Sequence, residues 1–363
     1  MIKNIKSQTD LSGIYVVYKG ASLLEERGNY GIAHLMEHLV CKSYEKYQDK
    51  LDIDGITANA YTSTNEIVFY FTGLDKQLNK WKGILINGLF DFNITKDEFE
   101  TERNIVLQEY LDSFNSQNSA HYYNFMRQKF NSFSAIGLKE DLEKLTYLDC
   151  LDFFKKQYSK ADIIINVSKH NNYHNEFLDY SDRNIDKTFK LGDYKVQEER
   201  LAKYKEKDDI IMYNDIYTDK PYLIKIISNM LSFGLQSPLY KEIREKRGLA
   251  YYVFMSGVRM NNQMFPMIGT STTPNKTQEF EKVVNDILLN YKKHLTKERF
   301  DIICSSMKNS FEISKINRYN NVNLYIDSNK FRLEDKIDNL NFDDVLEYAS
   351  ILFNKPWQIN IYN

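Results

Sequence analysis

Two histidines and a glutamate stand within five residues near the start of the chain. His34 and His38 are four positions apart, so on a helix they project from one face, one turn from each other. Two imidazoles placed this way can bind one metal ion, and Glu37 is then within reach of a water molecule on that ion. The order His-x-x-Glu-His is the inverted form of a zinc-peptidase helix motif. The alternative is a surface helix with two solvated histidines.

A catalytic zinc site needs a third protein ligand. Glu102 and Glu109 are seven residues apart, two helical turns, so both carboxylates project from one face of a helix predicted at residues 96–114. Paired glutamates on helices are mostly solvated. The incomplete two-histidine set nevertheless favours a carboxylate from this second helix. Cys41, one turn after His38, is a weaker candidate because its spacing fits no zinc pattern.

The elements around these residues follow from apolar periodicity. The metal helix starts after Gly31, and its apolar stripe, which borders both histidines, consists of Ile32, Leu35, Met36, Leu39 and Val40. A strand is predicted before it, at residues 12–18, and two more follow at 59–64 and 66–71. The last two strands either present an edge to an extended peptide or form a plain interior hairpin. The pattern does not choose between these.

The rest of the first half alternates helix signals with loops. Helices are predicted at residues 75–92 and 147–158, and the tract 121–144 is mostly helical. The apolar side expected for the helix at 96–114 consists of Phe99, Ile105, Val106, Tyr110 and Leu111. A strand at residues 162–167 closes this half.

The chain then repeats itself. Residues 145–167 align without gaps to residues 340–362, at an offset of 195, which predicts two copies of one helix-then-strand unit. The charged, Asn-rich stretch 170–199 between the copies is typical of a linker. The same offset puts the second copy of the metal helix at residues 229–233, where no ligand remains. One half therefore carries metal chemistry and the other has lost it.

The second half has a basic segment of its own. Residues 237–248 predict a helix rich in Arg and Lys that stops at Gly248, and a strand is predicted at 251–255. A solvated helix end with salt bridges is the alternative for its basic residues.

Composition limits the function classes. The 363 residues are 42% hydrophobic and 27% charged, which is typical of globular proteins of more than one domain. A formal net charge of −2 provides no basic field for nucleic acid or an anionic membrane. The three cysteines, Cys41, Cys150 and Cys304, have no framework spacing. With no signal-peptide-like or membrane-spanning segment, a cytoplasmic protein is expected.

Four motifs in this order resemble the pitrilysin/insulinase family of zinc peptidases: His34-x-x-Glu37-His38, the two glutamates, Asn59-Ala60-Tyr61-Thr62-Ser63, and the Arg244 to Tyr251 stretch. The resemblance covers essentially the whole chain. It is closest to the short members, such as the mitochondrial processing peptidase subunits and their bacterial relatives. It implies one zinc ion per chain, held by His34, His38 and Glu109, with Glu37 as general base and Glu102 orienting the site.

The resemblance also implies the substrate contacts and the fold. Asn59, Ala60, Tyr61 and Thr62 correspond to an edge strand that pairs with the substrate backbone, and Arg244 and Tyr251 to a pair that contacts the substrate and polarises its carbonyl. The implied fold is α+β (an α/β roll), with two homologous halves, each a mainly antiparallel sheet covered by helices, around a clam-like peptide chamber. The halves are expected at residues 1–180 and 199–363, joined by a linker at 181–198.

The function implied is a zinc metalloendopeptidase that acts on peptides or unfolded segments. In short members the motifs of the two halves are far apart within one chain, so a homodimer with the site completed across subunits is expected. Two alternatives remain. One is a catalytically silent member that acts as a structural or peptide-binding subunit, and the other is a zinc hydrolase of a non-peptide bond. The family often has an aromatic residue and Gly-Thr after its second histidine, whereas residues 39–43 here are Leu-Val-Cys-Lys-Ser.

Overall fold

The chain folds as two units, residues 1–199 and 200–363. The computed structural model describes residues 1–7, 9–115, 125–126, 135–173, 175–181, 207–216, 218, 220–260, 263–316 and 336–362. Apart from Ser181, the linker expected at residues 181–198 lies outside these ranges. So does half of the tract 121–144 that was expected to be helical, namely residues 121–124 and 127–134.

The first unit is built on a five-stranded sheet in the order β1-β5-β2-β4-β3. Its strands are β1 (Ile2–Lys6), β2 (Leu11–Lys19), β3 (Thr57–Thr62), β4 (Glu66–Leu74) and β5 (Ile163–Ser168). Only the pair β1–β5 is parallel, and the other pairs are antiparallel. β3 is the last strand of this order and pairs with β4 alone among the described strands, so the hairpin β3–β4 is at the edge of the sheet and not in its interior.

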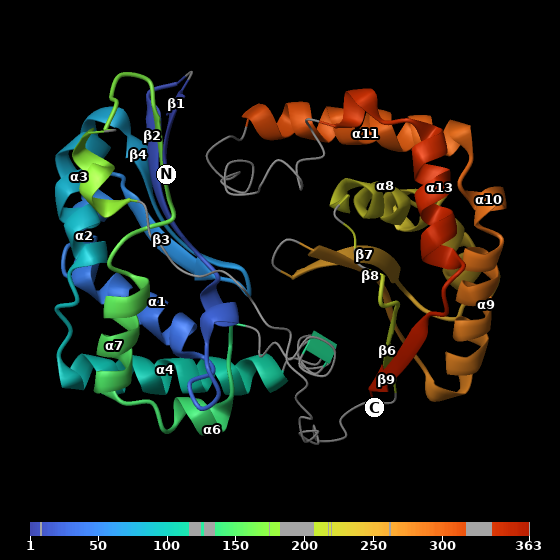
Figure 1. Ribbon diagram of the computed structural model, residues 1–363, viewed down its shortest axis with the longest axis horizontal. Helices are drawn as coiled ribbons and strands as arrows, with labels where there is room; N and C mark the ends of the chain where they lie inside the picture. The colour runs from blue at the N-terminus through green and yellow to red at the C-terminus, as the bar shows by residue number, and fades with distance from the viewer. Residues whose placement is uncertain are drawn as a thin grey trace. The chain divides into compact units, whose positions relative to one another are not determined.

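The helices of the first unit form one core with this sheet. They are α1 (Ile32–Glu45), α2 (Gln48–Ile53), α3 (Asp75–Phe90), α4 (Lys96–Asn115), α6 (Lys139–Leu142) and α7 (Tyr147–Gln157), with short 3₁₀ turns η1 (Ala21–Leu24) and η2 (Asn175–Tyr180). Figure 1 shows α1, α3 and α7 on the same side of the sheet. The apolar stripe of α1, with Leu35 and Met36 fully buried, belongs to the same core as Phe69 and Phe71 of β4. This packing fixes α1 against the sheet.

The second unit repeats the strand order of the first. Its sheet runs β7-β8-β6-β9 and is wholly antiparallel. Its strands are β6 (Asp208–Tyr213), β7 (Val253–Met260), β8 (Gln263–Thr272) and β9 (Gln358–Tyr362). In chain order these four strands correspond to β2, β3, β4 and β5, and the two sheets place corresponding strands in the same order. The prediction of two α+β halves with mainly antiparallel sheets is confirmed.

Some helices of the second unit keep the sequence offset of their counterparts in the first unit. They are α8 (Pro221–Ser232), η4 (Pro274–Lys276), α9 (Thr277–Leu289), α10 (Tyr291–His294), α11 (Lys297–Ile316), η6 (Ile337–Asn339) and α13 (Phe342–Phe353), with a π-helix, η3 (Tyr240–Lys246). α13 and β9 start 195 residues after α7 and β5, the offset of the sequence repeat. α8 follows β6 as α1 follows the corresponding strand β2, but α8 contains no His, Cys, Asp or Glu. α8 is therefore the counterpart of α1 without the candidate ligand residues.

Three details differ from the sequence expectations. The connection after the metal helix contains a further helix, α2. Residues 170–181 were expected to belong to the linker because this stretch is mostly polar. Its two aromatic residues Tyr173 and Phe177 are nevertheless buried in the core of the first unit, so they attach the stretch to that unit. On α4, Ile105 and Leu111 are each 41% exposed, while Phe99, Val106 and Tyr110 are buried. The apolar face of α4 is therefore narrower than expected.

Two findings bear on the expected location. Within the described part of the chain, no helix combines the length and apolarity that crossing a membrane requires. All three cysteines are free thiols. The cytoplasmic location stays a prediction.

Candidate metal centre

The metal helix begins where two glycines meet. Gly31, the residue before α1, has a φ of 101°, and Gly137 has a φ of 74°. A Cβ on Gly137 would lie 2.3 Å from Cα of Gly31, and a Cβ on Gly31 would lie 2.7 Å from a methyl carbon of Leu142. Since left-handed backbone and close approach both favour glycine, these residues seat the first turn of α1 against the segment before α6. Carboxylate oxygen Oε1 of Glu25 accepts a hydrogen bond from Ala33 N over 2.9 Å at the same helix end.

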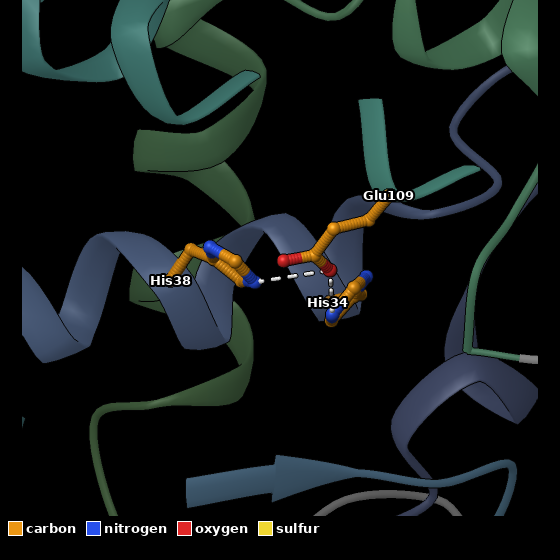
Figure 2. A group of neighbouring side chains, drawn as sticks. All are labelled: His34, His38 and Glu109. Carbon is orange, nitrogen blue, oxygen red and sulfur yellow. Dashed lines mark ion pairs between the residues drawn. The ribbon is translucent and has the colours of Figure 1, made fainter. Parts of the chain in front are cut away.

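His34, His38 and Glu109 converge on one point, as Figure 2 shows. Oε2 of Glu109 lies 3.5 Å from Nε2 of His34 and 3.7 Å from Nε2 of His38. The two imidazole rings are 4.9 Å apart and nearly perpendicular. In the described part of the chain these residues form the one group of three potential ligands with donor atoms within 4.8 Å of one another.

This donor set fits zinc. Two imidazole nitrogens and one carboxylate oxygen are the ligands of a common catalytic zinc site, which keeps a fourth position for water. Tetrahedral ligands bound at about 2.0–2.1 Å are roughly 3.4 Å apart, close to the Nε2–Oε2 distances seen here. Glu109 is 45% exposed at its side chain while the histidines are 15% and 18% exposed. The ligands therefore line an open-sided site.

α4 positions both glutamates by its buried face. Phe99, Val106 and Tyr110 anchor the helix in the core, and Glu102 and Glu109 project from it toward α1. Glu102 is buried, with a side chain only 6% exposed. The two-turn spacing therefore places the Glu109 carboxylate beside the Nε2 atoms of both histidines and the Glu102 carboxylate beside Nδ1 of His38.

Glu102 holds His38 in one orientation. Nδ1 of His38 lies 3.1 Å from Oε2 of Glu102, and Nζ of Lys42 lies 3.0 Å from Oε1. Because a carboxylate only accepts, Nδ1–H of His38 donates and the lone pair is left on Nε2, the atom that faces Glu109. Lys42 also contacts Glu45, one turn further along α1. His34 differs: its Nδ1 is buried and has no hydrogen-bond partner among the described residues.

Burial and neighbouring charges set the protonation of the site. Burial, together with the neighbouring His38, lowers the pKa of His34 to about 3, so this imidazole is neutral and ready to bind a cation. Burial raises the pKa of the Glu37 carboxyl; the Glu109 carboxylate adds to this rise, while the hydrogen bond from Thr62 opposes it. Burial also raises the pKa of Cys41 to about 12. The Cys41 thiol accepts a hydrogen bond from Tyr44 Oη over 2.9 Å and is outside the ligand group.

The edge strand β3 reaches the same site. Oγ1 of Thr62 donates to Oε2 of Glu37 over 2.5 Å. A cavity of about 350 Å³ is lined by Glu37 and His38 from α1 and by Ala58 and Asn59 from β3. Glu37, His38 and the first residues of the edge strand therefore face one space. The side chain of Asn59 accepts a hydrogen bond from the N–H of Ala60.

In the second unit, Arg244 and Tyr251, the pair expected to contact the substrate, lie against each other. The guanidinium carbon of Arg244 lies 4.4 Å from the ring centroid of Tyr251 and 5.0 Å from that of Tyr240. Tyr251 is 73% exposed, so this stack is at the surface of the described residues. The sequence reasoning missed Tyr240, although its position one turn before Arg244 was a usable signal.

Lys42 was missed as well. It follows His34 and His38 at the same four-residue spacing on one face of α1, and that spacing was the signal. Thr62 was expected to pair with the substrate through its backbone, which stays a prediction, and its side chain contacts Glu37.

The comparisons with known proteins assign the family. The model for insulinase (peptidase family M16) matches residues 2–137, and the model for the peptidase M16 inactive domain matches residues 194–307. The chain belongs to peptidase family M16. The two matches follow the two units, and the description "inactive domain" applies to the unit whose α8 has lost the ligands.

Relatives in this family carry protease names. A zinc protease of Rickettsia felis is 23% identical, over 95% of this chain and 90% of the relative. The beta subunit of the mitochondrial processing peptidase of Rattus norvegicus is 27% identical, over 44% of this chain and 34% of the relative. The solved structure of a protease from Helicobacter pylori superposes with a TM-score of 0.77 at 19% identity, covering all of this chain and 96% of that one. The resemblance read from the motifs is confirmed.

Proposed function

We propose that this protein is a zinc metalloendopeptidase that hydrolyses peptides or unfolded protein segments. The observation that carries the proposal is the convergence of His34, His38 and Glu109, with Glu37 adjacent on α1. The zinc-protease names of the family relatives support the same chemistry. Zinc, when bound, lowers the pKa of its coordinated water toward neutrality and polarises a carbonyl oxygen.

The chain's own residues prepare this chemistry. His34 is neutral because of its low pKa, and Glu102 fixes His38 in the tautomer that presents Nε2. Glu109 contributes a carboxylate oxygen, which offsets part of the charge of a divalent cation. These three side chains are held by the buried faces of α1 and α4.

Glu37 is the proposed general base. Its carboxylate takes a proton from the attacking water and returns that proton to the nitrogen of the leaving amine, so its own charge is restored after each turnover. Burial raises its pKa, which brings the carboxyl closer to the neutral pH at which it must both accept and release a proton.

A peptide substrate is supported by the edge strand. β3 has no strand on its outer side among the described residues, so an extended peptide can add to the sheet there through backbone hydrogen bonds. Asn59, Ala60, Tyr61 and Thr62 are the proposed backbone partners. Enclosure of the substrate in a chamber is part of the proposal, and it restricts substrates to peptides and unfolded segments.

Arg244 and Tyr251 are proposed to stabilise the developing oxyanion at the metal centre of a second copy of the chain. Arginine and tyrosine are the donor groups this step needs, and the two rings around Arg244 order its guanidinium. Mixing Glu37→Gln chains with Arg244→Ala chains tests the arrangement. A homodimer with shared sites regains about a quarter of the wild-type activity in mixed samples, if the chains pair at random. Mixed dimers that form and stay inactive would rule it out.

A catalytically silent subunit is the rival function. The described residues offer no support for it, because the candidate ligand atoms of His34, His38 and Glu109 lie within 4.8 Å of one another and Glu37 is on the same helix as both histidines. Metal analysis separates the two functions: the peptidase binds one zinc ion per chain, and a silent scaffold has no need of one.

The decisive experiment is a peptide-library digest by the purified protein. Cleavage is expected with zinc, is lost on adding a chelator and returns when zinc is restored. Folded substrate proteins should resist cleavage while their unfolded forms are cut. The Glu37→Gln variant is the control for contaminating peptidases. Chelator-resistant cleavage, or none from a zinc-loaded protein, would contradict the proposal.

A further inference from the structure

The hydroxyl of Thr62 joins the edge strand to the general base. Thr62 is the last residue of β3, and its Oγ1 donates to Oε2 of Glu37 over 2.5 Å. Among the described residues this is the one hydrogen bond to the Glu37 carboxylate. Glu37 and Thr62 are both half-buried, so water competes only partly for this contact.

Strand alternation shows which way Thr62 points. Successive side chains of a strand project to opposite faces, so Ala58, Ala60 and Thr62 share one face of β3 and Asn59 and Tyr61 share the other. Ala58 and Ala60 pack against the core that contains α1. The Thr62 side chain therefore belongs to the helix-facing side of the strand, and only its backbone is left for pairing at the edge.

The contact gives the carboxylate a fixed orientation. A glutamate side chain has several rotatable bonds, and a half-buried carboxylate with no hydrogen bond samples several rotamers. One oxygen, Oε2, is occupied by Thr62, which leaves Oε1 to exchange a proton. A reacting group held in one geometry before the reaction gains rate through preorganisation.

We infer that Thr62 is a positioning residue that links the docking of a peptide on β3 to the orientation of the Glu37 carboxylate. The assignment rests on the proposed function. The peptide pairs with the backbone of β3, and Thr62 at the end of this strand holds the Glu37 carboxylate. Binding of the peptide therefore restricts the motion of both β3 and the Glu37 carboxylate.

The test is Thr62→Val, which removes the hydroxyl and keeps the β-branched shape. The kcat for a zinc-dependent peptide substrate is expected to fall about 10- to 100-fold because the base loses its fixed orientation. The KM is expected to stay within about twofold, since backbone pairing is retained. Thr62→Ser, which restores the hydroxyl, is expected to recover most of kcat. Thr72→Val makes the same change on the neighbouring strand β4, away from the base, and is expected to match the wild type.

Two further measurements do not depend on turnover. The zinc affinity of Thr62→Val, measured by competition with a chelator, is expected to equal that of the wild type. In a crystal structure of the variant, the Glu37 carboxylate is expected to leave its position beside β3. Thr62→Ala serves the same comparison if the valine variant does not fold.

The outcomes separate the inference from the function on which it rests. An unchanged kcat in Thr62→Val, a higher KM at constant kcat, weaker zinc binding, or no recovery in Thr62→Ser would each overturn the role of Thr62 and leave the peptidase intact. A wild-type protein without zinc-dependent cleavage would overturn both.

Discussion

Glu102 accepts a hydrogen bond from Nδ1 of His38 over 3.1 Å, and this contact joins the two helices that supply the proposed metal ligands. His38 comes from α1 and Glu102 from α4, 64 residues later. Glu102 is buried, and its carboxylate has a partner on each oxygen: the Nδ1–H of His38 donates to one, and the ammonium group of Lys42 compensates the charge at the other. The orientation of a proposed ligand thus depends on a carboxylate that is not among the three proposed ligands.

Glu102→Gln is expected to weaken zinc binding about 10-fold or more, the usual cost of losing a partner that orients a metal-bound histidine. The amide oxygen still accepts from Nδ1–H, but the negative charge behind His38 is gone. The zinc dissociation constant, measured by chelator competition, checks this. Glu100→Gln, an exposed site on the same helix, is the control. Equal affinity in the two variants would show that Glu102 only fills space.

Lys42→Met is expected to weaken zinc binding about two- to fivefold, less than the loss of Glu102, because Lys42 is partly solvated and acts only through that carboxylate. The effect should disappear in the Glu102→Gln background, which a double-mutant cycle measures. Lys46→Met removes an exposed charge one turn further on and is the reference. An undiminished effect in the double variant would mean that Lys42 acts elsewhere.

Glu37→Gln is expected to lower kcat about 10²- to 10⁴-fold, the typical contribution of a general base. Zinc content should be unchanged, because Glu37 is not among the three ligands. The melting temperature should be equal or higher, since a carboxylate whose charge is disfavoured by burial is replaced by a neutral amide. Glu45→Gln, on the same helix, controls for loss of charge. Full turnover in Glu37→Gln would exclude the mechanism.

Glu25 makes the stability of the first unit depend on pH. Burial, opposed by hydrogen bonds from the backbone at the start of α1, raises the pKa of Glu25 to about 8 from an ordinary value of 4.5. Between these values the folded chain keeps a proton that the unfolded chain has lost. The free energy of unfolding therefore decreases as the pH rises from about 4.5 to 8, with an upper bound of about 5 kcal/mol for this residue.

Glu25→Gln removes that dependence while keeping an acceptor for Ala33 N–H. Relative to the wild type, the variant is expected to gain stability steadily from pH 5 to pH 8, as measured by denaturant unfolding at each pH. Glu26→Gln, its exposed neighbour, should follow the wild type at every pH. A constant difference between Glu25→Gln and the wild type across this range would contradict the raised pKa.

The residues of the centre were identifiable from spacing, because helical geometry is local. A separation of four puts His34 and His38 on one face, and a separation of seven does the same for Glu102 and Glu109. The repeat at an offset of 195 likewise predicted α13 and β9 from α7 and β5. Buried aromatic residues in a polar stretch, Tyr173 and Phe177, gave no such periodic signal, and that stretch was assigned to the linker.

The sequence by itself determined the candidate ligands, the two halves and the absence of such residues from α8, since these depend on residue identity and on periodicity along one element. Only the tertiary structure decided that β3 is an edge strand, that Thr62 contacts Glu37, and that Lys42 and His38 share Glu102. Each of these is a contact or pairing between elements distant in sequence. Strand order and helix packing arise from burial of the common core, which no local spacing records.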